Sequence, residues 1–367
     1  MRYARITLII FLFSSFLFAQ KVDLNKISGT VINKETDEPI PYVNVFLDAT
    51  TLGASTNNIG EYSIVGIPTG SYKIIASAIG FEKQTKNILI NSTKTIKIDF
   101  ILKPVIYKLN EVSIVAEEDD EWAKNMRLFK KEFLGTSTFS SKCTIVNPHV
   151  ITFSKDKKIK LKADATEPIE IINKALGYKV FFEIKDFELY QNREFNYFGN
   201  IRFVELETKD EDESNLWQKN RESAYKGSFR HFLVSLLNNS LLKNDFQIFM
   251  VNEPNWDNLR RRNFTIPAIS TIVKSISHFE NELTFYSNLM VVYNDWEDVG
   301  FQKYRNRMGS NIFRPMNFQT SWLKLPFSTA TFDINGNIMD DYRSTKFFGY
   351  WAWQRVANLL PNNYHPK

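Results

Sequence analysis

Tyr42-Val43-Asn44-Val45-Phe46-Leu47 has the two-residue alternation that is typical of a β-strand. Similar short runs occupy residues 61–64, 72–76 and 96–102. Glycine, proline and asparagine residues, which favour turns, lie between these runs. About seven strands in roughly 75 residues, with a turn every 8–12 residues, predict an antiparallel β-sandwich over residues 26–103.

Several motifs in this stretch carry a resemblance to a known family. In chain order they are Ser28-Gly29-Thr30-Val31, Glu38-Pro39-Ile40-Pro41-Tyr42-Val43-Asn44-Val45, Thr56-Asn57-Asn58-Ile59-Gly60-Glu61-Tyr62, Gly66-Ile67-Pro68-Thr69-Gly70-Ser71-Tyr72 and Ile79-Gly80-Phe81. The stretch resembles the carboxypeptidase-like regulatory domain, a transthyretin-like (prealbumin-like) sandwich of Bacteroidetes envelope proteins. The resemblance implies an accessory module, found beside zinc carboxypeptidases and at the front of TonB-dependent receptors. It does not imply peptidase activity.

The start of the chain predicts a signal peptide over residues 1–20. Arg2 and Arg5 precede an apolar run over residues 6–18, and Ala19-Gln20 then leads into polar sequence. The alternative is an uncleaved membrane anchor, but the run is shorter than the roughly 20 residues that a spanning helix needs. We therefore expect an exported protein that is periplasmic or associated with the outer membrane.

Charge and cysteine content narrow the class of protein. The formal net charge is +5, and without Arg2 and Arg5 it is about +3, so the balance does not indicate a nucleic-acid partner. Cys143 is the only cysteine, which excludes an intramolecular disulfide bond. The length suggests two domains, and we place a linker at residues 104–121 and a second domain at residues 122–367.

The linker contains a second, shorter resemblance. Lys108-Leu109-Asn110-Glu111-Val112-Ser113-Ile114-Val115 is similar to the segment that follows this module in TonB-dependent receptors. In those receptors an energy-transducing partner engages that segment. The alternative is an extended exit strand or a simple linker.

Residues 122–367 predict a larger, β-rich α+β domain of uncharacterised type. A helix over residues 122–133 ends at Gly135, and residues 159–165 and 180–184 alternate as strands. Residues 208–215 are expected to form a loop and residues 216–242 a helix, with Gly227 either within it or at a break. Further strands are expected at 283–293 and at 329–342, the latter around a hairpin turn over residues 333–337.

The search for catalytic motifs finds almost nothing. A zinc carboxypeptidase needs His and Glu separated by two residues, and none of the four histidines has this spacing. Serine-hydrolase and nucleotide-binding motifs are also absent from the sequence, and no cofactor or metal is predicted. Cys143 could form a thiol nucleophile with His149 or His231, but a lone cysteine beside strand-like sequence is more often a buried small side chain.

One polar cluster is a candidate ligand site. Tyr225, Ser228, Arg230 and His231 could line a pocket for an anionic or sugar ligand. In the alternative, Tyr225 and His231 satisfy buried hydrogen bonds while the cations stay in water. Basic clusters at residues 260–262 and 303–307 are interpreted as surface charge.

The sequence therefore favours a non-catalytic, exported cell-envelope protein that acts as an interaction or structural module. An envelope protein or a glycan is the expected partner, and no nucleic acid is expected. Two alternatives stay open. The first is a hydrolase of unrecognised type in the C-terminal domain. The second is a periplasmic accessory of an outer-membrane TonB-dependent transporter, which would be contacted through residues 108–115.

Overall fold

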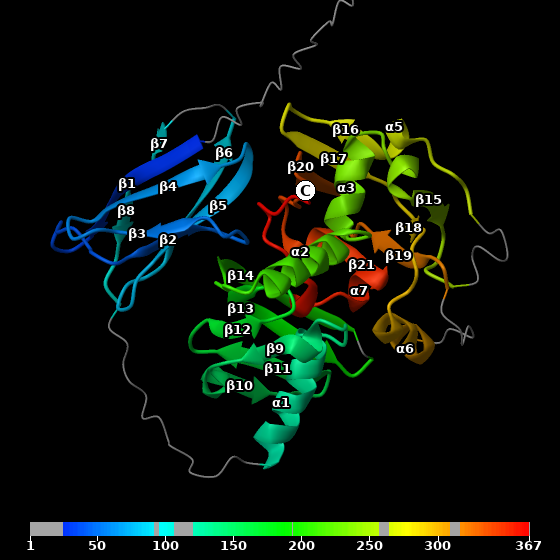
Figure 1. Ribbon diagram of the computed structural model, residues 1–367, viewed down its shortest axis with the longest axis horizontal. Coiled ribbons are helices and arrows are strands. Elements are labelled where there is room, and N and C mark those ends of the chain that lie inside the picture. Colours follow the sequence, from blue (N-terminus) through cyan, green and yellow to red (C-terminus); the bar gives the residue numbers. More distant parts are fainter. Residues whose placement is uncertain are drawn as a thin grey trace, which may run out of the picture.

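The computed structural model describes residues 25–91, 95–105, 120–192, 194–256, 264–308 and 316–366. Three predictions lie outside these residues: the signal peptide at 1–20, the receptor-like segment at 108–115 and the basic cluster at 260–262. The chain is mainly β, as predicted. Three groups of elements follow one another along the described residues (Figure 1).

The first group is a sandwich of two four-stranded sheets, with strand orders β4-β1-β7 (β8 also pairs with β1) and β3-β2-β5-β6 (Figure 1). The strands are β1 (Asn25–Asn33), β2 (Asn44–Leu47), β3 (Gly53–Ser55), β4 (Glu61–Ile67), β5 (Gly70–Ser77), β6 (Gln84–Ile90), β7 (Thr95–Lys97) and β8 (Phe100–Leu102). The buried residues of its core lie between Ile27 and Leu102. This placement agrees with the predicted segment 26–103, whose boundaries stay predictions.

The sandwich differs from the prediction in strand number and direction. It has eight strands among the described residues rather than about seven, because the run 96–102 divides at Asp99. The Asp99 carboxylate accepts the backbone N–H of Thr30 at 2.8 Å, where a continuous strand would instead make a ladder bond. β7 and β8 also pair with β1 in parallel. Side-chain alternation reports a strand but not its direction, so the antiparallel prediction is wrong for these two pairs.

The second group is a sheet of six strands covered by one helix. The sheet order is β10-β11-β13-β12-β9, and β14 pairs with β13. Phe129 and Phe133, two buried side chains of the helix, stack on each other and contact Phe187 in the sheet, so the predicted aromatic stripe belongs to the core. The elements are α1 (Asp120–Phe133), η1 (Ser140–Lys142), β9 (Cys143–Ile145), η2 (Pro148–Val150), β10 (Ile151–Ser154), β11 (Ile159–Ala165), β12 (Ile169–Asn173), β13 (Tyr178–Tyr190) and β14 (Phe195–Glu205).

The third group combines a four-stranded sheet, β15-β18-β19-β21, with a three-stranded sheet, β16-β17-β20. Its elements are α2 (Glu211–Tyr225), α3 (Phe229–Leu237), η3 (Leu242–Asn244), β15 (Phe246–Val251), α5 (Ile269–Ile272), β16 (Val273–Ser275), β17 (Glu280–Thr284), β18 (Asn288–Tyr293), α6 (Val299–Arg307), β19 (Gln319–Lys324), β20 (Thr329–Asp333), η4 (Tyr342–Ser344), β21 (Lys346–Gly349), α7 (Tyr350–Trp353) and η5 (Val356–Asn358). The predicted hairpin turn at 333–337 is present, since Asp333 N–H donates to the Asn337 carbonyl at 2.9 Å.

The predicted helix 216–242 is two helices. The first starts at Glu211, inside the expected loop, because the Asp210 side chain caps it and accepts the N–H groups of Asp212 and Glu213. It ends at Tyr225, because Gly227 has a φ of +71° and interrupts the helical backbone. Ser228 then caps the second helix, which ends at Leu237.

The basic cluster 303–307 is not surface charge throughout. Lys303 and Arg307 are exposed, but Arg305 is fully buried. Arg305 lies four positions after the buried Phe301, so both side chains lie on the inner face of α6. There the Arg305 guanidinium pairs with the carboxylate of Glu297, which explains how a cation can be buried.

Candidate functional site

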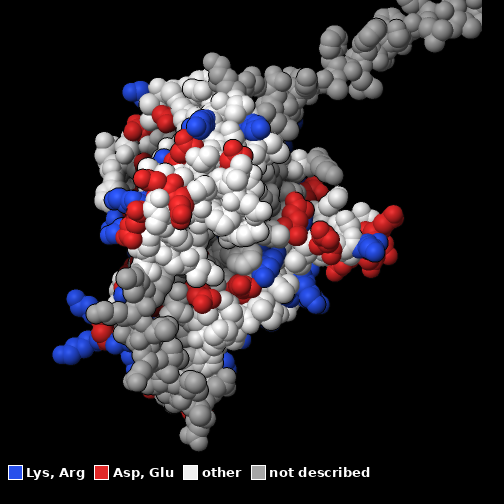
Figure 2. Space-filling model, turned by 90° about the vertical axis from the view of Figure 1, so that its left-hand side faces the viewer, with Lys and Arg blue, Asp and Glu red and all other residues white. Residues whose placement is uncertain are grey.

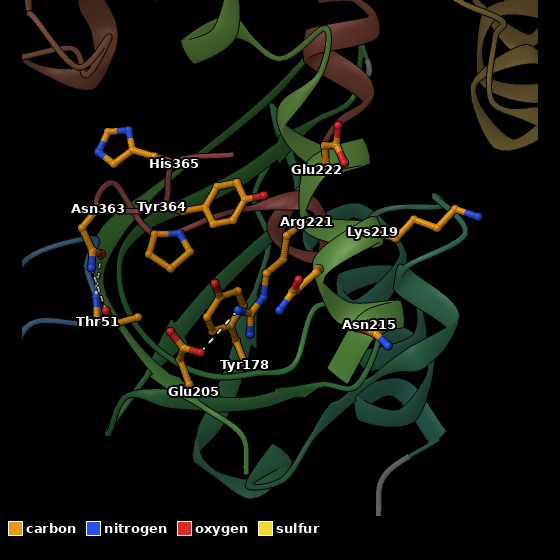
Figure 3. Close-up of a pocket in the computed structure, with 12 residues that line it drawn as sticks. Thr51, Tyr178, Glu205, Asn215, Lys219, Arg221, Glu222, Asn363, Tyr364 and His365 are labelled. Carbon is orange, nitrogen blue, oxygen red and sulfur yellow. Dashed lines mark hydrogen bonds and ion pairs between the residues drawn. The ribbon is translucent and has the colours of Figure 1, made fainter. Parts of the chain in front are cut away.

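A cavity of about 560 Å³ lies where the sandwich, the six-stranded sheet, α2 and the C-terminal tail meet (Figure 3). Its size is within the range of small-molecule sites in proteins. The side chains that line it are mostly polar. They are Thr51, Tyr178, Glu205, Asn215, Gln218, Lys219, Arg221, Glu222, Pro361, Asn363, Tyr364 and His365.

Helix α2 supplies one wall of the cavity through a stripe of polar residues. Asn215, Gln218, Lys219 and Glu222 are spaced by three, four and seven residues from the first, so they share one face of the helix. Trp217 is buried elsewhere on the helix, where its Nε1–H donates to the Lys174 carbonyl at 2.9 Å. The tryptophan therefore fixes the helix on the protein while the polar stripe faces the cavity.

Arg221 forms part of the cavity lining as a structural cation. Its Nε donates to the Leu176 carbonyl at 2.7 Å and its Nη2 to the Gly177 carbonyl at 3.2 Å. Its Nη1 lies 3.3 Å from a carboxylate oxygen of Glu205. The guanidinium also lies over the ring of Tyr178, 4.0 Å from its centroid. All three nitrogens thus bind protein groups, so this cation holds the lining together.

The C-terminal tail closes the other side of the cavity. Arg230 donates to the carbonyls of Pro361 at 2.7 Å and of Tyr364 at 2.6 Å. Between these two points the side chain of Asn363 accepts the Thr51 N–H at 3.1 Å and donates to the Thr51 hydroxyl at 2.8 Å (Figure 3). The tail is therefore bound both to α3 and to the sandwich.

The four predicted site residues lie beside the cavity and do not line it. Ser228 accepts the N–H of His231, Arg230 binds the tail, and the ring of Tyr225 lies 5.2 Å from the Arg230 guanidinium. The Nδ1 of His231 accepts the Gly227 N–H at 3.1 Å, and burial lowers the pKa of His231 to about 4. Arg230 donates to carbonyls of the tail, whereas the alternative interpretation expected the cations to stay in water. The binding of a ligand by the four residues stays a prediction.

Most residues of the cavity give no signal in the sequence. Thr51 is in a turn of the sandwich, and Tyr178 and Glu205 lie at the ends of two strands. Asn363 and Tyr364 follow a proline near the end of the chain. The polar stripe of α2 is a regular pattern among them, and three of its four members lie within the helix predicted to begin at residue 216.

The geometry gives little support to the alternative in which Cys143 is a thiol nucleophile. Cys143 lies in β9, its Sγ is 3.6 Å from the Phe139 carbonyl, and burial raises the pKa of the thiol to about 12. A protonated thiol is a poor nucleophile. Within the described ranges, no group of three or more His, Cys, Asp or Glu residues could hold a metal ion. No helix in the same ranges is long and apolar enough to span a membrane.

Comparison with known proteins places the first part of the chain in a family. Residues 27–114 match the family model described as CarboxypepD_reg-like domain. This segment is a CarboxypepD_reg-like domain. A TonB-dependent receptor, P39 of Formosa agariphila, is 34% identical over 108 residues. The match covers 29% of this chain and 10% of the receptor, so the chain corresponds to about a tenth of that protein's length. The match confirms the predicted family, the carboxypeptidase-like regulatory domain, for this segment.

Two solved structures are similar to parts of this chain. The minor pilin GBS52 of Streptococcus agalactiae has 15% identity and a TM-score of 0.21, covering 23% of this chain and 45% of the pilin. The 5-hydroxyisourate hydrolase of Klebsiella pneumoniae has 18% identity and a TM-score of 0.20, covering 22% of this chain and 92% of the hydrolase. Neither alignment covers a quarter of this chain.

Proposed function

We propose that this protein is a non-catalytic binding module of the cell envelope that takes a ligand in the cavity between its CarboxypepD_reg-like domain and its C-terminal part. The observation that carries the proposal is the composition of the cavity. Thr51 comes from the CarboxypepD_reg-like domain, α2 supplies one wall, and Tyr364 comes from the tail. A ligand held there would contact all three and would stabilise their mutual arrangement.

The charged groups of the cavity support binding rather than catalysis. Glu205 pairs with Arg221, and Glu222 pairs with Lys226 at 2.7 Å. An acid–base mechanism needs a carboxylate placed to exchange a proton with a substrate. Both carboxylates of the lining instead contact a cation of the protein. The pairing favours a role in fixing the shape of the cavity.

An envelope location is supported by the similarity to a TonB-dependent receptor and by the sequence of residues 1–20. The surface charge is compatible with it. On the face shown in Figure 2, acidic and basic side chains are intermixed and no large field of one sign forms. Fractionation of the source cells tests the location. The protein should be found in the periplasmic or outer-membrane fraction, and recovery from the cytosol would refute an envelope role.

Capture from solubilised envelope of the source cells tests the binding role. Gln218→Trp fills the cavity from α2 and should abolish capture of the partner. Leu216→Trp is the matched control, because Leu216 is 53% exposed on the same helix and does not line the cavity. It should capture the same material as the wild type. Equal capture by both variants would show that the cavity does not bind the partner.

A second candidate is an accessory of an outer-membrane transporter. The similarity to a TonB-dependent receptor and the sequence of residues 108–115 favour it. Deletion of residues 108–115 should then abolish co-purification with the transporter, while a Gly-Ser replacement of equal length should not restore it. Unchanged co-purification after the deletion would remove this candidate.

A further inference from the structure

Nine of the twelve lining residues divide into two sets. The charged side chains Glu205, Arg221 and Glu222 are paired with other protein groups, and Thr51 and Asn363 are bound to each other. These residues form the frame. The second set consists of neutral polar groups of the lining, and it decides what the cavity can recognise.

The second set has no hydrogen-bond partners in the protein. In the described part of the chain, no hydrogen bond involves the hydroxyls of Tyr178 and Tyr364 or the amides of Asn215 and Gln218. Figure 3 shows Tyr364 directed toward α2 across the cavity. Asn215, Gln218 and Tyr364 are accessible enough to bind water instead.

Tyr178 is the most informative of these residues. Tyr178 is only 2% exposed, and it lines the cavity. Its hydroxyl has no protein partner among the described residues. Buried polar groups in proteins nearly always have a hydrogen-bond partner. Burial raises the pKa of Tyr178, so its hydroxyl keeps its proton and can both donate and accept. The Tyr178 hydroxyl itself is not fully enclosed, so its partner is water or a ligand in the cavity.

We infer that the cavity binds a neutral carbohydrate, an inference that rests on the proposed binding role of the cavity. Primary amides and phenols each offer a donor and an acceptor, and sugar hydroxyls need both. The rings of Tyr178 and Tyr364 add apolar surface for the C–H faces of a sugar. Two amides and two phenols within one cavity therefore match a ligand with many hydroxyl groups and no charge.

The charges of the cavity argue against other classes of ligand. An anionic ligand needs cations that can reach it, but the nitrogens of Arg221 are bound to protein groups. Lys219 is the remaining cation of the lining, and in Figure 3 it extends away from the tyrosines. A hydrophobic ligand would leave the four neutral polar groups without partners, which costs free energy.

An array of immobilised oligosaccharides tests the inference with the full-length mature protein. The array should contain neutral oligosaccharides together with uronic-acid and sulfated versions. We expect binding to neutral members, followed by calorimetric titration of the best one. Tyr178→Phe removes only the hydroxyl and should weaken binding roughly 2- to 10-fold, the effect of one neutral hydrogen bond. Gln218→Leu should have an effect of similar size.

Matched variants separate these effects from general damage to the protein. Tyr286→Phe removes an equally neutral hydroxyl from a residue that is 87% exposed in a turn, and Gln191→Leu removes an exposed amide outside the cavity. Both should bind like the wild type. Binding confined to charged oligosaccharides, or equal affinity in Tyr178→Phe and Tyr286→Phe, would overturn the inference.

The capture and oligosaccharide-binding results together show whether the carbohydrate inference fails alone or together with the proposed function. If envelope capture still depends on position 218 but no neutral oligosaccharide binds, the carbohydrate assignment is wrong and the binding module stands. If capture is unaffected by Gln218→Trp as well, both fail. Neutral oligosaccharide binding that Gln218→Trp abolishes and Leu216→Trp preserves supports both.

Discussion

At the scale of single residues, the buried ion pair between Glu297 and Arg305 has the largest expected effect on stability. Both side chains are fully buried, and the two N–O contacts are each 2.9 Å. The Met316 N–H donates to the same carboxylate. Removal of one partner leaves an uncompensated charge in the interior. We expect Glu297→Gln to lower the free energy of unfolding by about 3 kcal/mol.

Urea unfolding measures this change, and an exposed ion pair provides the control. Glu194 pairs with Lys346 at 2.7 Å, with side chains that are 53% and 46% exposed. Exposed pairs contribute at most about 1 kcal/mol, so Glu194→Gln should change stability little. A double variant, Glu297→Gln with Arg305→Met, should recover part of the loss. Similar losses from Glu297→Gln and Glu194→Gln would contradict the prediction.

Gly227, between the two helices, is the residue that sets where α2 ends. Its φ is +71°, and an added Cβ would lie 2.7 Å from the ring of Tyr293. Gly80 has a similar φ of +82° but open space around it. Both Gly→Ala variants add backbone strain of about 1 kcal/mol, and only Gly227→Ala also adds a clash. Gly227→Ala should therefore lower the midpoint of thermal unfolding more. Equal midpoints would show that packing at this position is loose.

Single residues also show why the site was predicted only in part. The sequence pointed to Arg230 and His231, and both lie next to the cavity. It could not reveal that Arg230 binds carbonyls more than 100 residues away, since the bond to Pro361 spans 131 positions. Likewise, nothing around Tyr178 shows that its hydroxyl faces a cavity. Such contacts depend on how distant segments pack, whereas a sequence pattern reports only local neighbours.

At the scale of elements, period-two alternation predicted the strands because a sheet with one buried face requires it. The same pattern carries no information on pairing, so the parallel contacts of β1 with β7 and β8 were missed. The start of α2 was missed because its first turn is acidic and polar, although acidic residues there favour a helix. Strand existence was therefore easier to predict than strand direction or helix boundaries.

The turn after β20 contacts β5, a distant part of the chain, through the backbone of Ser71. The stability of this contact should depend on pH. Asp333 is 1% exposed, and burial raises its pKa despite hydrogen bonds from the backbone of Asn337, Asn335 and Ser71. The folded state therefore binds the Asp333 proton more tightly than the unfolded chain, whose pKa is about 3.9. This contribution to stability is fully present below that value and is lost as pH rises through the folded pKa.

Comparison of the wild type with Asp333→Asn isolates this contribution. The unfolding free energy of the wild type, relative to that of the variant, should increase as the pH is lowered from 7 to about 4. Asp341→Asn is a control of opposite sign, since the hydrogen bond from Arg343 lowers the pKa of Asp341. Its wild-type advantage should stay nearly constant over this interval and decrease only below about pH 4. Denaturant unfolding at several pH values measures both. A constant difference for Asp333→Asn would contradict the raised pKa.

At the scale of the whole molecule, the last residues of the chain connect the three groups of elements. Trp351 packs in the core of the third group, and Val356 packs in the core of the second. Asn363 then binds Thr51 in the sandwich. The sandwich also extends the open edge of β14, because the Ala49 N–H donates to the Ile201 carbonyl. The cavity exists only where these long-range contacts coincide, which is why its composition could not be predicted.

Removal of the tail should therefore loosen the sandwich without unfolding the cores. A chain that ends at Leu360 lacks the bond from Asn362 N–H to the Ala49 carbonyl and both bonds between Asn363 and Thr51. Each bond stabilises the contact by about 1 kcal/mol, so exchange of the Ala49 amide should accelerate roughly 10-fold or more. Hydrogen–deuterium exchange measures this, with the buried strand β18 as an internal reference that should not change. Asn363→Ala should have a smaller effect at the same amide, and an unaltered Ala49 amide in the truncated chain would show that β14 alone holds the sandwich.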